Sequence, residues 1–163
     1  GEGMGDLNPE HVKAVINVIN QGPYIRYLSM SVKEMGIGYA IVETKIGNEH
    51  MHPFGRIHGG AYASILDTAA YWAVYCEVDE DAGFTSIDLK IDFLAPFDRG
   101  IIIAKGKIIK IGKTMCLAEA TVVDESGKWL AHGTSKMMVT KGLQTIEDAL
   151  KFTGAEALPP KFI

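Results

Sequence analysis

Long apolar runs and an excess of positive charge are both missing from this chain of 163 residues. Because no apolar stretch approaches the roughly 20 residues that cross a bilayer as a helix, no membrane-spanning segment is predicted. Lys and Arg number 16 against 20 Asp and Glu, so the net charge is −4. Nucleic-acid binding depends on clustered cations that neutralise phosphates. We therefore expect neither a membrane nor a nucleic acid among the partners.

Cysteine is also scarce. Cys76 and Cys116 lie in apolar surroundings and form neither a CxxC motif nor a Cys/His spacing, which argues against a disulfide framework and against a zinc site. Two buried thiols in a reducing compartment are the favoured interpretation. No basic segment followed by an apolar stretch, the pattern of a secretory signal, is visible near the N-terminus. The expected location is the cytoplasm, and no metal site is predicted.

The composition, 47% hydrophobic and 22% charged, is typical of a globular protein, and one domain over residues 1–163 is expected. The first three residues are interpreted as a remnant of cloning. Asn8 and Pro9 are residue types that begin helices, and apolar residues follow at helical spacing, which predicts a helix over residues 8–21. In the C-terminal extension, residues 144–163, we expect a short helix and a Pro-Pro end that frays.

Segments with strand character follow one another along most of the chain. They comprise a hairpin over residues 32–46, an alternating strand over 86–94, and three further strands over 101–109, 114–123 and 129–140. Only short turns separate the last four, and parallel crossovers need a dozen or more residues. The sequence therefore predicts an α+β fold, with a curved, mainly antiparallel sheet of five or six strands.

Residues 58–75 are small or apolar nearly all round and predict a buried central helix around which this sheet wraps. Asp67 stands in the middle of that helix. A buried ionised carboxylate costs several kcal/mol unless it is paired or functional. Burial alone gives equal weight to two alternatives, a structural hydrogen bond to a neighbouring hydroxyl or histidine and a catalytic role.

The start of the same helix, His58-Gly59-Gly60, shifts the balance toward catalysis. Free backbone N–H groups at a helix start polarise a carbonyl oxygen, and a carboxylate attacks the carbon or activates water. However, Gly60 and Asp67 are seven residues apart, which separates them by about 10 Å along a helix. One reacting carbon cannot lie within reach of both groups in one chain. A symmetric dimer with antiparallel helices is therefore predicted.

His58-Gly59-Gly60, followed by Asp67 and by Thr85-Ser86-Ile87-Asp88-Leu89, resembles the PaaI-like (4HBT superfamily) hotdog-fold acyl-CoA thioesterases. The resemblance covers roughly residues 36–140. It implies a hotdog fold, a homodimer that pairs into a dimer of dimers, and an acyl-CoA substrate. It further implies thioester hydrolysis without a metal or any other cofactor. CoA is not counted as a cofactor, because it is part of the substrate.

The resemblance also implies residue roles. Asp67 is the nucleophile or general base, the Gly59 backbone N–H polarises the thioester carbonyl, and Ser86 lies beside the acid. The family often has Asn where this chain has His52, which leaves open whether His52 orients the water or substrate or whether the loop simply differs. His58, Gly60 and Thr85 are the expected substrate-binding residues beside these groups.

The sequence favours roles other than proton transfer for four of the histidines. For His58, helix capping or packing is favoured over proton donation. His11 and His50 are expected to be solvated, and His132 to be a packing residue.

The segment Lys110-Ile111-Gly112-Lys113-Thr114 is a predicted turn with two cations. A solvated hairpin and a site for the phosphates of CoA are equally weighted from the residues alone. In the resembling family this turn lies near the nucleotide part of CoA, so Lys110, Gly112, Lys113 and Thr114 are candidate substrate-binding residues. For the aromatic residues Tyr71, Trp72 and Tyr75, core or dimer interface is favoured over an acyl pocket.

Two other functions remain open at this point. A hotdog hydratase or dehydratase would act on an acyl thioester with a histidine and a carboxylate, and the His58-Gly59-Gly60 and Asp67 pattern suits it less well. A non-catalytic acyl-CoA-binding domain would tolerate the loss of Asp67, whereas an enzyme would not.

Overall fold

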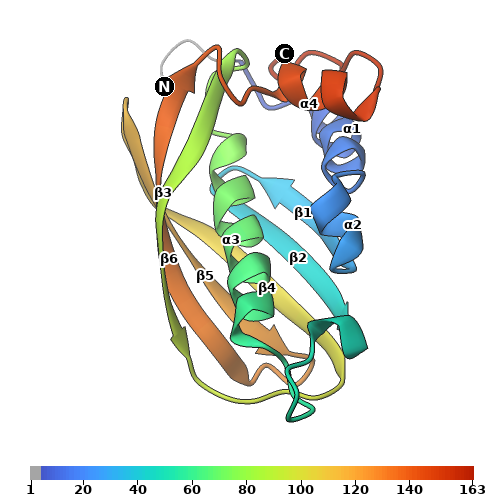
Figure 1. Ribbon diagram of the computed structural model, residues 1–163. Helices are drawn as coiled ribbons and strands as arrows, with labels where there is room; N and C mark the ends of the chain where they lie inside the picture. The colour runs from blue at the N-terminus through green and yellow to red at the C-terminus, as the bar shows by residue number, and fades with distance from the viewer. Residues whose placement is uncertain (1–4) are drawn as a thin grey trace.

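The computed structural model describes residues 5–163; the first three residues, interpreted above as a cloning remnant, lie outside this range. The elements in chain order are α1 (Pro9–Ile19), α2 (Pro23–Tyr27), β1 (Met30–Gly36), β2 (Tyr39–Ile46), the 3-10 helix η1 (Asn48–His50), α3 (Gly59–Tyr75), β3 (Ala82–Phe93), β4 (Gly100–Ile111), β5 (Met115–Asp124), β6 (Trp129–Lys141) and α4 (Ile146–Thr153). Figure 1 shows the curved sheet wrapped around α3, with α1 and α2 beside it and α4 near one end. The predicted α+β architecture is confirmed.

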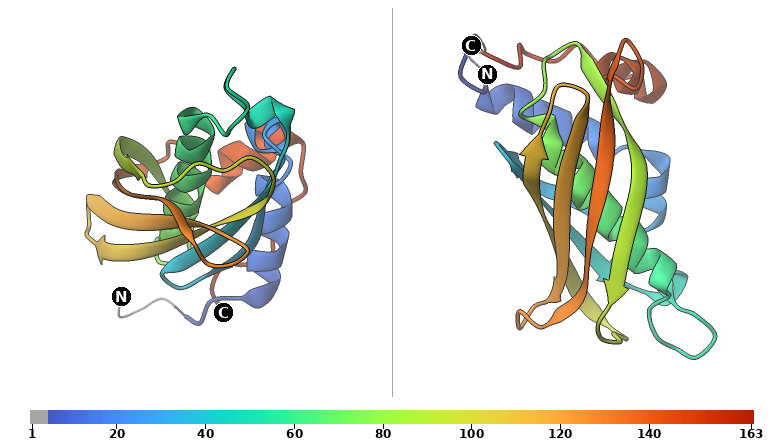
Figure 2. Two further views of the ribbon diagram at one scale, coloured as in Figure 1. Left: turned by 90° about the horizontal axis from the view of Figure 1, so that it is seen from below. Right: turned by 90° about the vertical axis from the view of Figure 1, so that its left-hand side faces the viewer.

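The six strands form one sheet in the order β1-β2-β4-β5-β6-β3, and every neighbouring pair is antiparallel. The three strands β4, β5 and β6 form a meander, as their short turns predicted. β3 follows α3 in the chain and pairs only with β6, at the edge of the sheet (Figure 2). Within residues 5–163, the other edge of β3 has no paired strand in the protomer.

β3 departs from the strict alternation expected of residues 86–94. The pairing register shifts between Ser86 and Asp88, so Ile87 stands in a bulge. Leu89 and Ile91 pack against the core, but Ile87 and Phe93 are 49% and 58% exposed. The sequence pattern marked a fully apolar face, and the edge position of β3 leaves parts of it uncovered.

α3 lies directly on the sheet because glycine permits a close approach. A Cβ atom at Gly106 of β4 would stand 2.1 Å from the Ala69 carbonyl oxygen of α3. The side of α3 that faces the sheet is buried. A stripe on the other side stays partly or fully exposed and consists of Gly59, Gly60, Ala63, Ser64, Asp67, Tyr71 and Trp72. This stripe, called the open stripe below, is the surface on which the candidate site is built.

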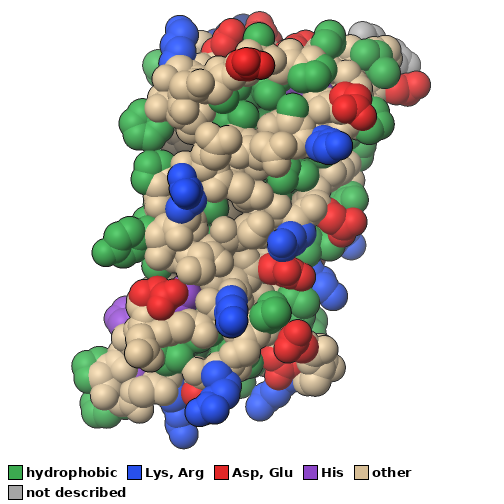
Figure 3. Space-filling view, turned by 90° about the vertical axis from the view of Figure 1, so that its right-hand side faces the viewer, with side chains coloured by type: hydrophobic (Ala, Val, Ile, Leu, Met, Phe, Trp, Pro, Cys, Tyr) green, Lys and Arg blue, Asp and Glu red, His purple; other side chains and the backbone are tan. Residues whose placement is uncertain are grey.

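The surface beside α1 and α2 mixes both signs of charge. Lys and Arg side chains alternate there with Asp and Glu, without a field of one sign (Figure 3). Over residues 5–163, no helix combines the length and apolar character needed to cross a membrane.

The C-terminal end is packed, so the expectation that it frays is wrong. The Lys161 side chain is completely buried and its Nζ donates to the carbonyl oxygens of Tyr75 at 2.6 Å and Val78 at 2.7 Å. The last carbonyls of a helix have no intrahelical partner, and a cation complements them. Burial lowers the pKa of Lys161 to about 8. This cap on α3 could not be read from the local Pro-Pro sequence.

Two histidines expected to be solvated are buried, which corrects that prediction. His11 is 1% exposed, and its ring nitrogens contact the Pro159 carbonyl oxygen and the Tyr75 hydroxyl, both at 2.7 Å. His50 is 2% exposed; its Nδ1 accepts from the Gly47 N–H at 2.9 Å. His11 finds its partners on α3 and near the C-terminal end, and the second ring nitrogen of His50 contacts the Leu28 carbonyl oxygen, so local sequence spacing did not indicate that either ring is buried. His132 stacks on the Trp129 ring, in the packing role expected for it.

The buried Lys161 cap supports a stability prediction. Lys161→Met keeps an apolar stem but leaves two buried carbonyl oxygens without their charged donor, each such bond contributing about 1.5–3 kcal/mol. Because burying the cation is itself costly, the expected net loss is roughly 2 kcal/mol. That corresponds to a Tm lower by about 4–8 °C for a chain of this size, measured by thermal unfolding. Lys151→Met, at an exposed position of α4, is the control; equal melting of the two variants would contradict the capping role.

Candidate active site

His58 caps α3 and thereby determines which backbone donors stay free. Its backbone is extended (φ −69°, ψ 138°) and its Nδ1 accepts a hydrogen bond from the Gly60 N–H at 2.7 Å. A Cβ atom at Gly60 would lie 2.9 Å from that Nδ1. The capping role favoured for His58 is confirmed, and Gly60 is the residue that leaves room for it.

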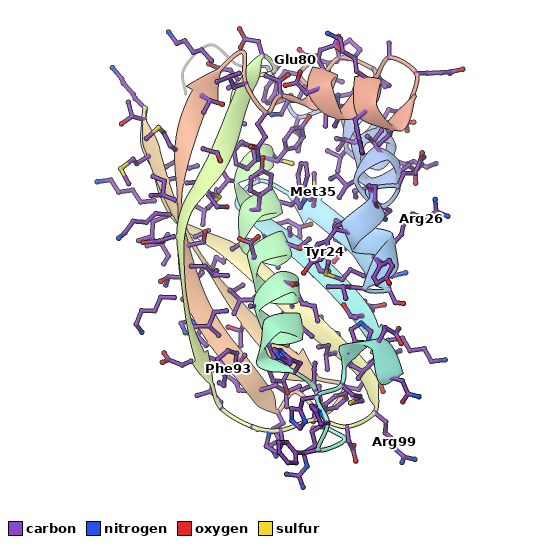
Figure 4. All side chains as sticks on the ribbon, in the orientation of Figure 1. Tyr24, Arg26, Met35, Glu80, Phe93 and Arg99 are labelled. Atoms are coloured by element: carbon purple, nitrogen blue, oxygen red, sulfur yellow. The ribbon has the colours of Figure 1, made fainter. Side chains whose placement is uncertain are left out.

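The first turn of α3 leaves one N–H group available. The N–H groups of Ala61 and Tyr62 both donate to the His58 carbonyl oxygen, at 2.9 and 3.4 Å. Gly60 is bound by the His58 ring, so within residues 5–163 the Gly59 N–H is the first-turn donor with no hydrogen-bond acceptor. A Cβ atom at Gly59 would stand 3.1 Å from the Phe93 ring, which Figure 4 shows beside this end of α3. An unpaired donor at a helix start suits a carbonyl oxygen that gains negative charge.

Asp67 lies two helical turns further along, half-buried on the open stripe. Burial raises the pKa of Asp67 above its ordinary value, and a hydrogen bond from the Ser86 side chain acts in the opposite direction. The predicted proximity of Ser86 and Asp67 is therefore present. A carboxylate with a raised pKa is a better proton acceptor near neutral pH than an ordinary aspartate.

Alternate side chains of β3 contact successive turns of α3 beside Asp67. Phe84 and Ser86 lie on the same face of β3, because alternate residues of a strand share a face. Phe84 stacks on the ring of Tyr71 with 4.1 Å between ring centroids, and Ser86 contacts Asp67 one turn earlier on the helix. Thr85 points to the opposite face of the sheet. The structure thus brings Ser86, and not Thr85, to the acid of its own protomer.

Gly59 and Asp67 lie eight residues apart along the regular helix α3, which places them about 12 Å apart along its axis. The protomer therefore carries both chemical groups on one stripe, too far apart to act on one carbonyl.

His52 lies in the loop that leads into α3. Its Nδ1 accepts from the Phe54 N–H at 3.1 Å, and its ring meets the Phe54 ring edge-on. It lines a cavity of about 570 Å³ together with Asn48 and Arg99, and Figure 4 places Arg99 at this end of the molecule.

The turn between β4 and β5 contains a third group of candidate residues. Lys110, Gly112 and Thr114 line a cavity of about 300 Å³, and Lys136 of β6 adds a cation that the sequence did not point to. Lys113 is exposed in the turn and does not line the cavity. Lys136 reaches this place through the pairing of β5 with β6, so only the register of the sheet identifies it.

Comparisons with known proteins agree on one family. The model of the thioesterase superfamily matches residues 54–131. Acyl-coenzyme A thioesterase 13 of Homo sapiens is 30% identical over 98 residues, which are 59% of this chain and 69% of that protein. The 1,4-dihydroxy-2-naphthoyl-CoA hydrolase of Listeria monocytogenes is 26% identical over 104 residues, 64% of this chain and 85% of the hydrolase.

Solved structures agree on the fold. A thioesterase from Haemophilus influenzae superposes with a TM-score of 0.75 at 17% identity, covering 81% of this chain and 92% of the other. A thioesterase family protein from Silicibacter pomeroyi gives a TM-score of 0.75 at 21% identity, covering 81% and 99%. The predicted hotdog fold is confirmed. The chain belongs to the thioesterase superfamily and is a thioester hydrolase.

Proposed function

We propose that this protein hydrolyses acyl-CoA thioesters to the free acid and CoA, at sites shared between two protomers. One observation carries the proposal: the open stripe of α3 holds an unpaired Gly59 N–H and the half-buried Asp67, which are complementary halves of a hydrolytic site. The human relative is named for acyl-coenzyme A and the Listeria relative for a naphthoyl-CoA. Both names support CoA as the thiol part of the substrate.

In the proposed mechanism, the thioester carbonyl oxygen accepts a hydrogen bond from the Gly59 N–H of one protomer. Asp67 of the other protomer either attacks the carbonyl carbon or removes a proton from an attacking water molecule. The C–S bond breaks, the CoA sulfur leaves as a thiolate and takes up a proton, and water supplies the oxygen of the new acid. When Asp67 is the nucleophile, water then cleaves the acyl-enzyme anhydride. Ser86 holds the carboxylate in place in either case.

The geometry of the open stripe supports antiparallel pairing of two α3 helices. For Gly59 of each protomer to face Asp67 of the other, the helices must cross at the midpoint, which is Ala63. Ala63 is small and partly exposed, so two helices can approach closely there. The open edge of β3 bears the exposed apolar residues Ile87, Phe93 and Leu94, which a second copy would cover. Assembly of such dimers into a tetramer is part of the proposal and rests on the resemblance.

The same crossing brings the loop that carries His52 toward the Asp67 of the other protomer. There His52 either orients the water or substrate or only shapes the loop, the two roles left open by the sequence. The proposed cytoplasmic location is supported by Cys76 and Cys116, which are both buried and free. Thiols in that state are typical of a reducing compartment.

For the nucleotide part of CoA, the proposed contact is the cavity at the β4–β5 turn. Lys110 and Lys136 stand on its walls, and Lys113 is exposed beside it. Lysine binds phosphate as a mobile point charge. Gly112 is required by the turn, since a Cβ atom there would lie 2.6 Å from the Met115 carbonyl oxygen.

The phosphate contact predicts a selective effect on KM. Replacing both Lys110 and Lys113 by Ala should raise KM for acyl-CoA by about twofold to thirtyfold, since each exposed charge pair is worth about 0.2–1 kcal/mol. The kcat should fall less, because the phosphates are remote from the carbonyl. Lys105→Ala with Lys107→Ala, exposed positions of β4 outside the cavity, is the control. An unchanged KM in the first pair would move the phosphate site elsewhere.

A direct test measures thiol release from acetyl-CoA, phenylacetyl-CoA and dodecanoyl-CoA with purified protein, alongside hydration of crotonyl-CoA. Thiol release from at least one substrate, with no hydration, is the expected result. Hydration without thiol release would identify a hydratase. Tight acyl-CoA binding without either reaction would identify a binding domain.

A further inference from the structure

A partly open aromatic cavity of about 340 Å³ lies between α3, β3 and the segment leading into α4. Its walls from α3 and β3 are four aromatic residues, Tyr71, Trp72, Tyr75 and Phe84. Tyr71 stacks on Phe84 and meets Trp72 edge-on, with ring centroids 4.1 and 5.0 Å apart. The cavity falls within the size range of small-molecule sites. Aromatic walls of this kind bind a planar ring by stacking.

The cavity continues directly from the candidate catalytic acid. Tyr71 follows Asp67 by four residues on α3, so the two side chains are neighbours on one face of the helix. On β3, Phe84 comes two residues before Ser86 and stacks on Tyr71, so it lies toward the same end of α3 as Tyr71. The contact between Asp67 and Ser86 is therefore followed, one turn further along α3, by the contact between Tyr71 and Phe84. An acyl group whose carbonyl carbon lies at Asp67 has this cavity within one helical turn.

The far wall is formed by the segment 144–149, which includes the first turn of α4. A Cβ atom at Gly83 would lie 2.0 Å from the Leu143 carbonyl oxygen, so the glycine lets this segment lie directly on β3. Gln144 has a left-handed backbone (φ 54°), and its Nε2 donates to the Tyr71 hydroxyl at 3.1 Å. Strained backbone held by specific contacts is typical of functional segments.

A capping box stabilises the N-terminus of α4. Asp148 Oδ2 accepts from the Thr145 N–H at 3.0 Å and from the Thr145 hydroxyl at 3.2 Å. Ile146 and Ala149 of this helix then face the cavity. The match to the thioesterase superfamily ends at residue 131. The far wall is thus supplied by a part of the chain beyond the matched segment.

We propose that this cavity receives the acyl group and that α4 closes its end, so the enzyme selects compact acyl groups with a single aromatic ring and excludes long linear chains. The proposal rests on the proposed function, since it places the acyl carbon at Asp67. The Tyr71 hydroxyl donates to the Phe84 carbonyl oxygen at 2.7 Å and accepts from Gln144. Ring and wall are therefore held rigid, and a rigid end wall discriminates by length.

A competing location for the acyl group is the apolar cavity beside Gly59, lined by Tyr62, Phe93 and Leu94. Phe93 and Leu94 are more than half exposed on the open edge of β3, where the proposed dimer covers them. The aromatic cavity is lined by four aromatic rings and by the segment 144–149, and Tyr71 on its wall is one helical turn from Asp67. We therefore favour it, and the experiment distinguishes the two.

The test compares three substrates, acetyl-CoA, phenylacetyl-CoA and dodecanoyl-CoA, in the wild type and in Ala149→Leu. The larger side chain enters the cavity, and kcat/KM for phenylacetyl-CoA should fall at least about tenfold, as misfit of a few methylenes does in an apolar pocket. The value for acetyl-CoA should change less than about twofold, because its methyl group does not reach α4. Glu147→Leu places the same side chain on the exposed face of α4 and is the control.

Occupancy of the cavity is measured without turnover by fluorescence. The chain has two tryptophans, and Trp129→Phe leaves Trp72 in the cavity wall as the reporter. In this background, with Asp67→Asn to prevent hydrolysis, phenylacetyl-CoA should change the Trp72 emission. Ala149→Leu should raise the phenylacetyl-CoA concentration that gives half of this emission change by at least about tenfold.

The outcomes separate the two proposals. The pocket proposal is overturned if Ala149→Leu and Glu147→Leu behave alike, if dodecanoyl-CoA is cleaved as well as phenylacetyl-CoA, or if Trp72 emission does not respond. Sensitivity to Leu94→Trp instead would move the acyl group to the cavity beside Gly59. Failure of the proposed function has a different signature, namely no thiol release from any of the three substrates.

Discussion

Asp67→Asn should lower kcat for thioester cleavage by at least about 10²–10⁴-fold, the range for losing a general base. The amide keeps the size of the side chain and a polar contact for Ser86. It has no negative charge with which to attack a thioester carbon or take a proton from water. Acyl-CoA should still bind, because the Gly59 N–H and the lysines at the β4–β5 turn are unchanged.

Folding should survive this change, since an amide is no more costly to bury than a carboxylate whose pKa burial already raises. The Tm should stay level or rise, as removing a buried active-site charge often stabilises. Thioester cleavage, acyl-CoA affinity and thermal unfolding are measured together, with Asp92→Asn on the exposed face of β3 as the matched control. Full activity would remove Asp67 from the mechanism, whereas a collapsed Tm would assign it the structural role left open by the sequence.

Local sequence patterns predicted most of the fold because each strand and the central helix carries its own periodicity. The turns after β4 and β5 are too short for crossovers, so the antiparallel meander followed from the sequence. α2 and η1 were missed, since helices of five and three residues have too few positions for a periodic pattern. The bulge at Ile87 was missed too, because it depends on pairing with β6.

The residues of the candidate site also fall into those that the sequence indicated and those that it did not. Gly59 and Asp67 stood out because each conflicts with its surroundings, a free donor at a helix start and a carboxylate in an apolar helix. Lys136 and Gln144 carry no such conflict in the sequence. They reach the site through sheet register and through the path of the chain after β6. The packed C-terminal end shows the same limit, since Lys161 finds its acceptors at Tyr75, the last residue of α3, and at Val78 just after it, far away in the sequence.

Ala63→Arg should abolish activity by breaking the dimer while leaving the protomer folded. Ala63 is partly exposed at the middle of the open stripe, where the proposed crossing brings the two α3 helices together. Arginine is a good helix former, so α3 itself should tolerate it. Two arginines facing each other at the crossing would keep the helices apart by bulk and by like charge. Each Asp67 would then lose the Gly59 N–H supplied by the other protomer.

The loss of one such donor costs about 10²–10³-fold in kcat, so activity should fall at least about 100-fold. Light scattering should give the mass of one chain for Ala63→Arg and at least twice that mass for the wild type, with unchanged far-ultraviolet circular dichroism. Ala157→Arg, an exposed position near the C-terminal end, adds the same charge away from the stripe and should keep both mass and activity. A monomeric Ala63→Arg variant with wild-type turnover would mean that one chain holds a complete site, because no second helix would then be present to contribute Gly59.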